Sequence, residues 1–248
     1  MENLQFFLVS AAVFALILGL AVLAERYLCK DRKQFSNTHY ISYTAIFSAI
    51  SGVLMLMEIP LFFAPGFYKL DISEMPVLIC TFYLGPVAGV TAELLKVIVK
   101  LLIKGTSTAF VGDFANFVVG CSFILPASII YHARPGKKTA LIGMGVGTLV
   151  LTVFGSLFNG FYLIPKFAVL FGMPMDAIVA MGTKVNAAIT DVWTLVAFAV
   201  VPFNLVKGVA VSALTFLLYK RISPILHKND AKRAARSKKP QGGATQQS

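Results

Sequence analysis

The chain is poor in charge, and it lacks the balance of polar and apolar residues that a soluble protein needs. Only 13% of its 248 residues are charged and 57% are hydrophobic, with a mean hydropathy of +0.79. A soluble domain has about 25% charged residues and roughly 45–50% apolar ones. One water-surrounded core could not hide this much apolar surface. We therefore expect an all-α integral membrane protein, with helical spans of about 20 residues each.

Signatures of catalysis and of ATP binding are also missing. The sequence contains no Walker A motif, no Gly-x-Ser-x-Gly and no His-Glu-x-x-His. Its cysteines, Cys29, Cys80 and Cys121, are few and widely spaced, which argues against a disulfide framework. Its three histidines have no spacing typical of metal ligands. We expect no enzyme, no metal and no catalytic cofactor, so any ATP hydrolysis must come from separate subunits.

Apolar runs long enough to cross a bilayer recur between short polar breaks. The expected crossing segments are 4–23, 40–63, 75–84, 87–103, 109–131, 139–163 and 202–219. The first run is not typical of a cleaved signal peptide, because no basic residue precedes it. The stretch 166–201 mixes charges with short apolar runs, and we expect it to lie in the outer interface. The predicted organisation is an extra N-terminal transmembrane helix (1–28), a basic linker (29–39), a six-helix membrane domain (40–226) and a basic tail (227–248).

Basic residues gather in three segments, and their positions predict the orientation of the chain. Fifteen of the 22 Lys and Arg residues lie at 26–33, 134–138 and 220–239. Loops rich in Lys and Arg stay on the cytoplasmic side, so we expect the N-terminus outside and the C-terminus inside a multi-pass protein of a bacterial cell membrane. The net charge of +11 then reflects orientation rather than a nucleic-acid partner. The tail is rich in Lys, Arg, Ser, Gly and Gln, and we expect it to be disordered.

Polar groups at membrane depth form the first set of candidate functional residues. Such groups are costly unless they pair, face a cavity or snorkel to the interface. Glu74 enters an apolar helix and needs a donor or a cation, whereas Asp71 could equally be a helix cap. Asn204 and Lys207 share one face of the last helix, about one turn below its outer end, although Lys207 could instead snorkel. Asn159 approaches the same depth from another helix, so the set predicts a pocket.

Three further patterns accompany this set. Aromatic residues surround it and form either an interfacial belt or, in part, walls that stack on a flat ligand; they are Phe62, Phe63, Phe67, Tyr68, Phe161 and Tyr162. Lys96, Lys100 and Lys104 repeat every four residues and Glu93 precedes them, which favours an intramembrane pair plus snorkelling, or else contact with a partner protein. Ala45 and Ala49 have the small-xxx-small spacing that lets another helix approach closely.

Three stretches resemble the substrate-binding S components of energy-coupling factor (ECF) vitamin transporters, and among them the riboflavin-specific members. The stretches are FYKLDISEMPVLI with FYLGPVAGV, LIKGTSTAFVGDFANFVVGCSFILPAS, and NGFYLIP with VPFNLVKG. The resemblance implies a six-helix membrane protein that binds its vitamin near the outer face under a loop matching 64–71. It implies riboflavin as bound substrate, with contacts from Glu74, Asn159, Asn204 and Lys207, and we expect the loop to add Phe67, Tyr68, Leu70 and Asp71.

The resemblance also implies partners. Ala45 and Ala49 would dock on a transmembrane coupling (T) subunit that carries two ATP-hydrolysing subunits, and the S component would release riboflavin inside after docking. Two alternatives stay open from the sequence: an S component for another vitamin, and a membrane enzyme or self-sufficient channel that uses the buried charges.

Overall fold

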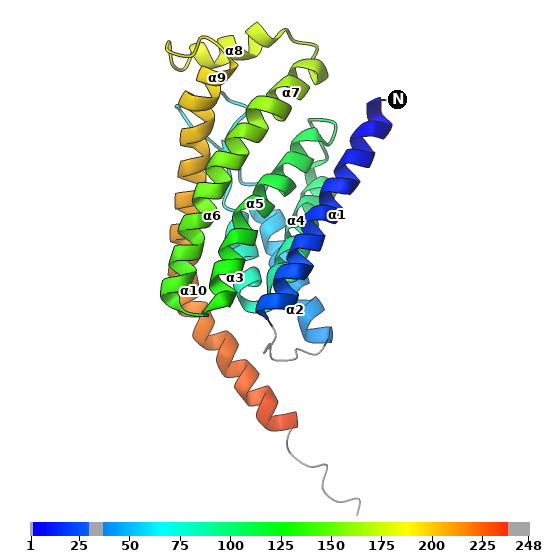
Figure 1. The fold of residues 1–248 in the computed structure, drawn as a ribbon, viewed down its shortest axis with the longest axis vertical. Helices are drawn as coiled ribbons and strands as arrows, with labels where there is room; N and C mark the ends of the chain where they lie inside the picture. The colour runs from blue at the N-terminus through cyan, green and yellow to red at the C-terminus, as the bar shows by residue number, and fades with distance from the viewer. Residues whose placement is uncertain (1, 30–36, 238–248) are drawn as a thin grey trace, which may run out of the picture.

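The computed structural model describes residues 2–29 and 37–237, and it is a bundle of long helices with shorter elements at one end (Figure 1). The helices are α1 (Glu2–Leu28), α2 (Asn37–Leu54), α3 (Glu74–Leu84), α4 (Pro86–Lys104), α5 (Val111–Ala133), α6 (Lys137–Phe158), α7 (Ile164–Leu170), α8 (Met175–Thr183), α9 (Val192–Leu195) and α10 (Val201–Ser237). Two π-helical turns, η1 (Asn159–Leu163) and η2 (Val196–Val200), join α6 to α7 and α9 to α10. Two short strands, β1 (Ile59–Pro60) and β2 (Lys69–Leu70), pair antiparallel.

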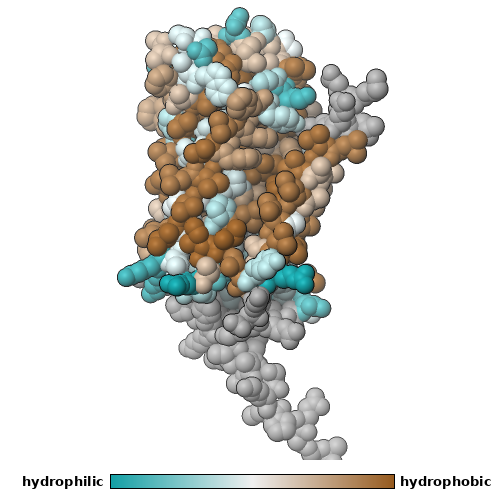
Figure 2. Space-filling model, in the orientation of Figure 1, coloured by the Kyte–Doolittle hydropathy of each residue, from teal (hydrophilic) through white to brown (hydrophobic). Residues whose placement is uncertain are grey.

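Four helices of the described chain are long and apolar enough to cross a membrane. They are Leu8–Leu28, Val111–Ala133, Lys137–Leu170 and Val192–Tyr219. The face of the molecule seen in Figure 2 carries a broad hydrophobic band between more hydrophilic ends. These features confirm an all-α membrane protein. The count of seven crossings stays a prediction, since α3 has only 11 residues.

The second helix ends earlier than the sequence predicted. We expected a span over 40–63, but α2 stops at Leu54 and the chain then enters the β1–β2 hairpin. Pro60 and Pro65 lack the backbone N–H that a continuing helix would use. The residues that follow Leu54 therefore belong to a loop, so the prediction was wrong at its C-terminal end.

The last long helix begins ten residues earlier than predicted, at Val192 rather than Pro202. Asp191 starts it: its Oδ1 accepts from the backbone N–H groups of Trp193 and Thr194, at 2.7 and 2.9 Å. The Thr194 hydroxyl accepts in return from the Asp191 N–H at 2.8 Å, which completes a capping box. The turn η2 carries the helix into Pro202, which donates no backbone hydrogen bond.

These boundaries also correct the predicted interfacial stretch. The helix of α6 continues through η1 and α7 to Leu170, so the long helices take up both ends of 166–201. Only 171–191 lies between them, and it contains the short helix α8. Asn204 is consequently twelve residues inside its helix, roughly 18 Å along the axis, and much deeper than the one turn expected.

The extra N-terminal helix lies on the outside of the bundle against α4 and α5 (Figure 1). Ile17 and Ala21 pack with Val90 of α4 and Phe117 of α5. Near its end, the Glu25 carboxylate accepts from the Val87 N–H at 3.0 Å. This N–H is one of the donors that the first turn of α4 leaves without a helical partner, so α1 is fixed to the core by a polar contact as well as by packing.

The two ends of the bundle differ in the elements they contain. The start of α1 lies at the end that holds α7 and α8, whereas the α5–α6 connection and the end of α10 lie at the other (Figure 1). That separation agrees with the predicted placement of basic segments on one side. The helix α10 continues to Ser237, so the tail predicted as disordered from 227 is helical in its first part. The rest of the tail (238–248) and linker residues 30–36 lie outside the described residues.

Candidate ligand-binding site

A cavity of about 660 Å³ opens between the loop before α3 and the helices α5, α8 and α10. This volume is in the range of small-molecule sites, roughly 300–1,000 Å³. The candidate residues from the sequence that line the cavity are Phe67, Tyr68, Asp71, Asn159, Asn204 and Lys207. The structure therefore brings together polar side chains from the loop, from η1 and from α10 at one hollow.

Tyr68 attaches the loop that covers the cavity to the helices beneath it. Tyr68 is buried, and its hydroxyl donates to Asn159 Oδ1 at 2.9 Å. Its ring packs on Phe67 and on Phe203 of α10, with centroids 4.6 and 5.4 Å apart. Leu70 is only partly buried and packs in the neighbouring apolar cluster rather than against the cavity.

An ion-pair cluster holds the strands of this loop to α4. Glu58 accepts from Lys69 and from Lys104, each at 2.8 Å. Burial acts to raise the pKa of Glu58, but the two lysines outweigh it and hold the pKa below its usual value. Glu58 is therefore ionised at neutral pH and ties β2 to the end of α4.

The two asparagines lie on facing helices. Asn159 donates from Nδ2 to the Gly155 carbonyl at 2.7 Å, and this leaves Oδ1 for Tyr68. Asn204 donates to Ser156 Oγ at 3.3 Å. A Cβ at position 155 would lie 3.0 Å from Asn204 Nδ2, so glycine there lets the amide of α10 sit against α6.

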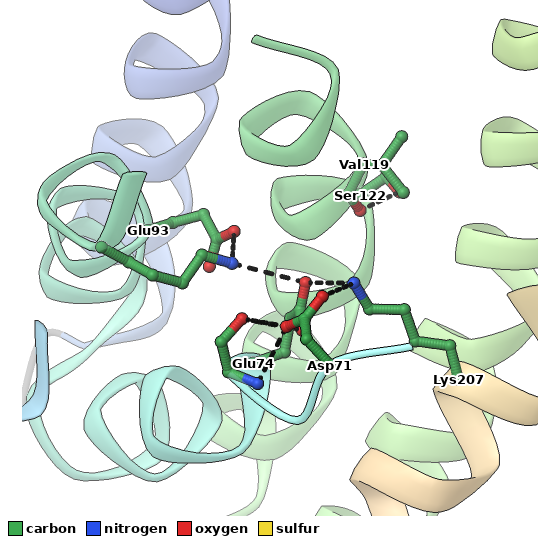
Figure 3. A network of polar contacts seen from close by, with 8 residues as sticks. Asp71, Glu74, Glu93, Val119, Ser122 and Lys207 are labelled. Atoms are coloured by element: carbon green, nitrogen blue, oxygen red, sulfur yellow. Dashed lines mark hydrogen bonds and ion pairs between the residues drawn. The ribbon is translucent and has the colours of Figure 1, made fainter. Parts of the chain in front are cut away.

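Lys207 is buried between two carboxylates and does not snorkel. It is 6% exposed, and its Nζ lies 3.0 Å from Asp71 Oδ2 and 2.9 Å from Glu74 Oε1 (Figure 3). The snorkelling alternative is wrong, because the head group is paired inside the protein. Asp71 Oδ1 also accepts from the Ser73 N–H at 3.0 Å, so Asp71 combines a local turn contact with the ion pair.

Glu74 lies behind Lys207 and connects the site to α4. Its Oε1 is also 3.4 Å from Lys96 Nζ, and Lys96 in turn pairs with Glu93. Among the sequence candidates, Glu74 and Leu70 do not line the cavity. The buried network thus runs from the loop through Lys207 to the middle of α4 (Figure 3), and Glu74 acts on the cavity through Lys207.

The lysine repeat on α4 is paired along its whole length. The expected Glu93–Lys96 pair is confirmed, and Lys100 pairs with Asp113 of α5 at 2.6 Å. Lys96 is fully buried, so it faces neither lipid headgroups nor a partner protein. The snorkelling prediction was wrong for Lys100, which is buried and paired. The role of Asp113 was missed, although its place in the first turn of an apolar helix was a signal.

Other aromatic and small residues lie on the outside. Phe62 and Phe161 are strongly exposed, at 93% and 71%, which is typical of an interfacial belt. Ala45 and Ala49 lie on an exposed face of α2 beside Ile46 and Ile50. Further cavity-lining residues that the sequence did not single out are Asn116, Phe167, Met173 and Ile178.

Comparison with known proteins decides the family. The model of the substrate-specific component of ECF transporters matches residues 39–219. The chain belongs to this family. It is therefore a transporter component rather than an enzyme, and the α1 helix lies outside the matched region. A solved structure described as the S component of a bacterial ECF transporter has 32% sequence identity and a TM-score of 0.62, covering 77% of this chain and 99% of the other.

Curated proteins that are similar to this chain are named as riboflavin transporters. The chain is 34% identical to riboflavin transporter RibU of Staphylococcus aureus over 73% of its own length and 89% of the relative. It is 28% identical to riboflavin transporter FmnP of Bacillus subtilis over 73% and 90%, and 29% identical to riboflavin transporter RibU of Streptococcus thermophilus over 78% and 87%.

Proposed function

We propose that this ECF component binds riboflavin at the outer face of a bacterial cell membrane and delivers it inward. The observation that carries the proposal is the cavity, where the amides of Asn159 and Asn204 and the ammonium of Lys207 converge beside aromatic walls. The similarity to transporters named for riboflavin supports the same substrate. The vitamin is a transported substrate here and not a catalytic cofactor.

The chemistry of the cavity suits a flat, largely apolar ring system with polar edges. Phe67, Tyr68 and Phe203 offer apolar surfaces for the ring. Asn159, Asn204 and Lys207 offer hydrogen bonds to ring carbonyls, ring NH and ribityl hydroxyls. Glu74 contributes by holding Lys207, and Leu70 by packing the covering loop.

The transport step requires partners that this chain does not supply. We propose that a transmembrane coupling subunit docks on the α2 face that carries Ala45 and Ala49, because small exposed residues let a second helix approach closely. Two ATP-hydrolysing subunits bound to that partner would supply the energy. The N-terminus would lie outside and the C-terminus inside, as the basic segments indicate.

Flavin fluorescence tests the proposal directly. Full-length protein in detergent should quench riboflavin fluorescence without ATP. The variant Asn204→Leu should bind riboflavin several-fold more weakly, because a buried amide contact is lost. Thiamine, biotin and folate should not compete, which tests the alternative of another vitamin. Uptake into vesicles should require the coupling module, and flavin flux through the lone protein would contradict the proposal.

A further inference from the structure

The network behind Lys207 contains more carboxylates than cations. Its members are Asp71, Glu74, Glu93, Lys96 and Lys207. With every group ionised, three negative charges would face two positive ones, in a region where each side chain is less than a tenth exposed. An uncompensated charge in such surroundings is strongly disfavoured, and a buried group takes up a proton rather than stay charged. The charge count alone calls for one bound proton.

The position of the proton follows from the hydrogen bonds. Asp71 Oδ2 and Glu74 Oε1 both accept from Lys207, and Asp71 Oδ1 accepts from Ser73. Glu93 uses Oε1 for Lys96, whereas its Oε2 is buried and has no hydrogen-bond partner among the described residues. An oxygen with no donor near it is the natural place for a proton, because an ionised carboxylate would lose its solvation there.

Within the described parts of the chain, no other group that could neutralise Glu93 faces it. Glu74 of α3 and Cys121 of α5 face it, together with Lys96 and Lys207. The remaining elements packed on α4 bring Glu25 of α1, which binds the Val87 N–H, and His39 of α2, which bonds Tyr83. Gly120 of α5 makes room for the carboxyl, since a Cβ there would lie 2.0 Å from Oε1.

We propose that Glu93 is a proton-binding site whose occupation tightens the vitamin site. When Glu93 is protonated, Lys96 is the cation that balances Glu74, and Asp71 balances Lys207. Lys207 can then turn and donate a hydrogen bond to the ligand. When Glu93 ionises, it competes with Glu74 for Lys96. Glu74 then attracts Lys207 more strongly, and the extra negative charge opposes movement of the Lys207 ammonium toward the vitamin. The inference rests on the proposed function, since it names the proton as a second ligand of the same site.

Binding measured against pH tests this inference. In the full-length protein, riboflavin affinity should fall as pH rises above neutrality, by up to about tenfold per pH unit, the limiting slope when one proton is linked to binding. Glu93→Gln is a neutral mimic of the protonated acid, and it should keep the tight affinity across the range. Asp176→Asn, on the exposed side of α8, is the matched control and should follow the unmodified protein.

Infrared spectroscopy provides a readout that needs no flavin. The ligand-free protein should show the carbonyl stretch of an un-ionised carboxyl near neutral pH, and this band should disappear in Glu93→Gln and on raising the pH of the unmodified protein. Absence of the band in the folded, unmodified protein would overturn the inference even if the variant did not fold. A pH-independent affinity, or the same pH profile in Glu93→Gln, would also overturn it. Failure to bind riboflavin at any pH, with the band present, would instead refute the proposed function.

Discussion

Replacing Lys207 by methionine tests the buried network most sharply. Methionine keeps an unbranched apolar stem but removes the charge that faces Asp71 Oδ2 and Glu74 Oε1, at 3.0 and 2.9 Å. Breaking a buried ion pair by removing one partner costs about 3–5 kcal/mol, because the remaining charge stays buried without compensation. The free energy of unfolding of Lys207→Met should therefore fall by about this amount.

A second substitution shows whether the loss comes from the orphaned carboxylate. In Asp71→Asn/Lys207→Met, Glu74 keeps Lys96 as its cation and Asp71 no longer carries a charge. The loss in free energy of unfolding of the double variant should therefore be smaller than the summed losses of the two single variants. The difference should be about 0.5–3 kcal/mol, the usual coupling between contacting residues. Guanidinium is charged and screens ion pairs, so urea or thermal unfolding in a non-ionic detergent is the appropriate assay.

Binding adds an independent measure of the same residue. If Lys207 donates to the ligand, Lys207→Met should weaken riboflavin binding by about 1–3 kcal/mol, the cost of leaving a buried partner unsatisfied. Titration of flavin fluorescence gives the dissociation constant. A stability change below about 0.5 kcal/mol and an unchanged affinity would mean that Lys207 behaves like an exposed surface charge, and the reasoning on the site would fail.

Three further predictions address other parts of the molecule. Ala49→Trp should bind riboflavin normally but lose assembly with the coupling subunit, since a large side chain prevents close helix contact; co-purification measures this, and retained assembly would contradict it. Tyr68→Phe removes the hydroxyl that donates to Asn159 and should cost about 1 kcal/mol of stability, measured by thermal unfolding against Tyr162→Phe, a more exposed tyrosine. The pKa of Glu58 is lower in the folded protein than its usual 4.5, so its ion pairs stabilise the hairpin above that pH and are lost as pH falls through the folded pKa. Proteolysis of the 55–70 loop should therefore increase in acid, and Glu58→Gln should show no such change.

The sequence predicts the parts of this fold that depend on local pattern. Helical spacing places Asn204 and Lys207 on one face, and the cost of burying polar groups in a bilayer marks them with Asn159 and Glu74 as functional candidates. Helix ends were predicted less well. Pro202 reads as the start of a helix, but the π-helical turn before it lets the helix begin at Val192.

Pairings between distant segments could not be predicted in the same way. Asp71 and Lys207 are 136 residues apart, and the sequence allowed one to be a cap and the other to snorkel. Lys100 and Asp113 likewise lie on different helices, so only the packing of α4 on α5 brings them together. In a membrane helix, the side that faces lipid is apolar like the side that faces the core. Hydrophobic periodicity therefore does not show which face of α2 or α6 points inward.

The loop over the cavity is held by three contacts of different strength, and their order bears on release. Tyr68 and Asn159 share one neutral hydrogen bond, which contributes about 1 kcal/mol. Glu58 with Lys69 is a partly exposed pair and contributes less, typically under about 1 kcal/mol. Asp71 with Lys207 is a buried ion pair, and Glu74 Oε1 still contacts Lys207 Nζ if Asp71 leaves. If the loop opens, Lys207 therefore keeps Glu74 as a hydrogen-bond partner, which a single buried ion pair would not permit.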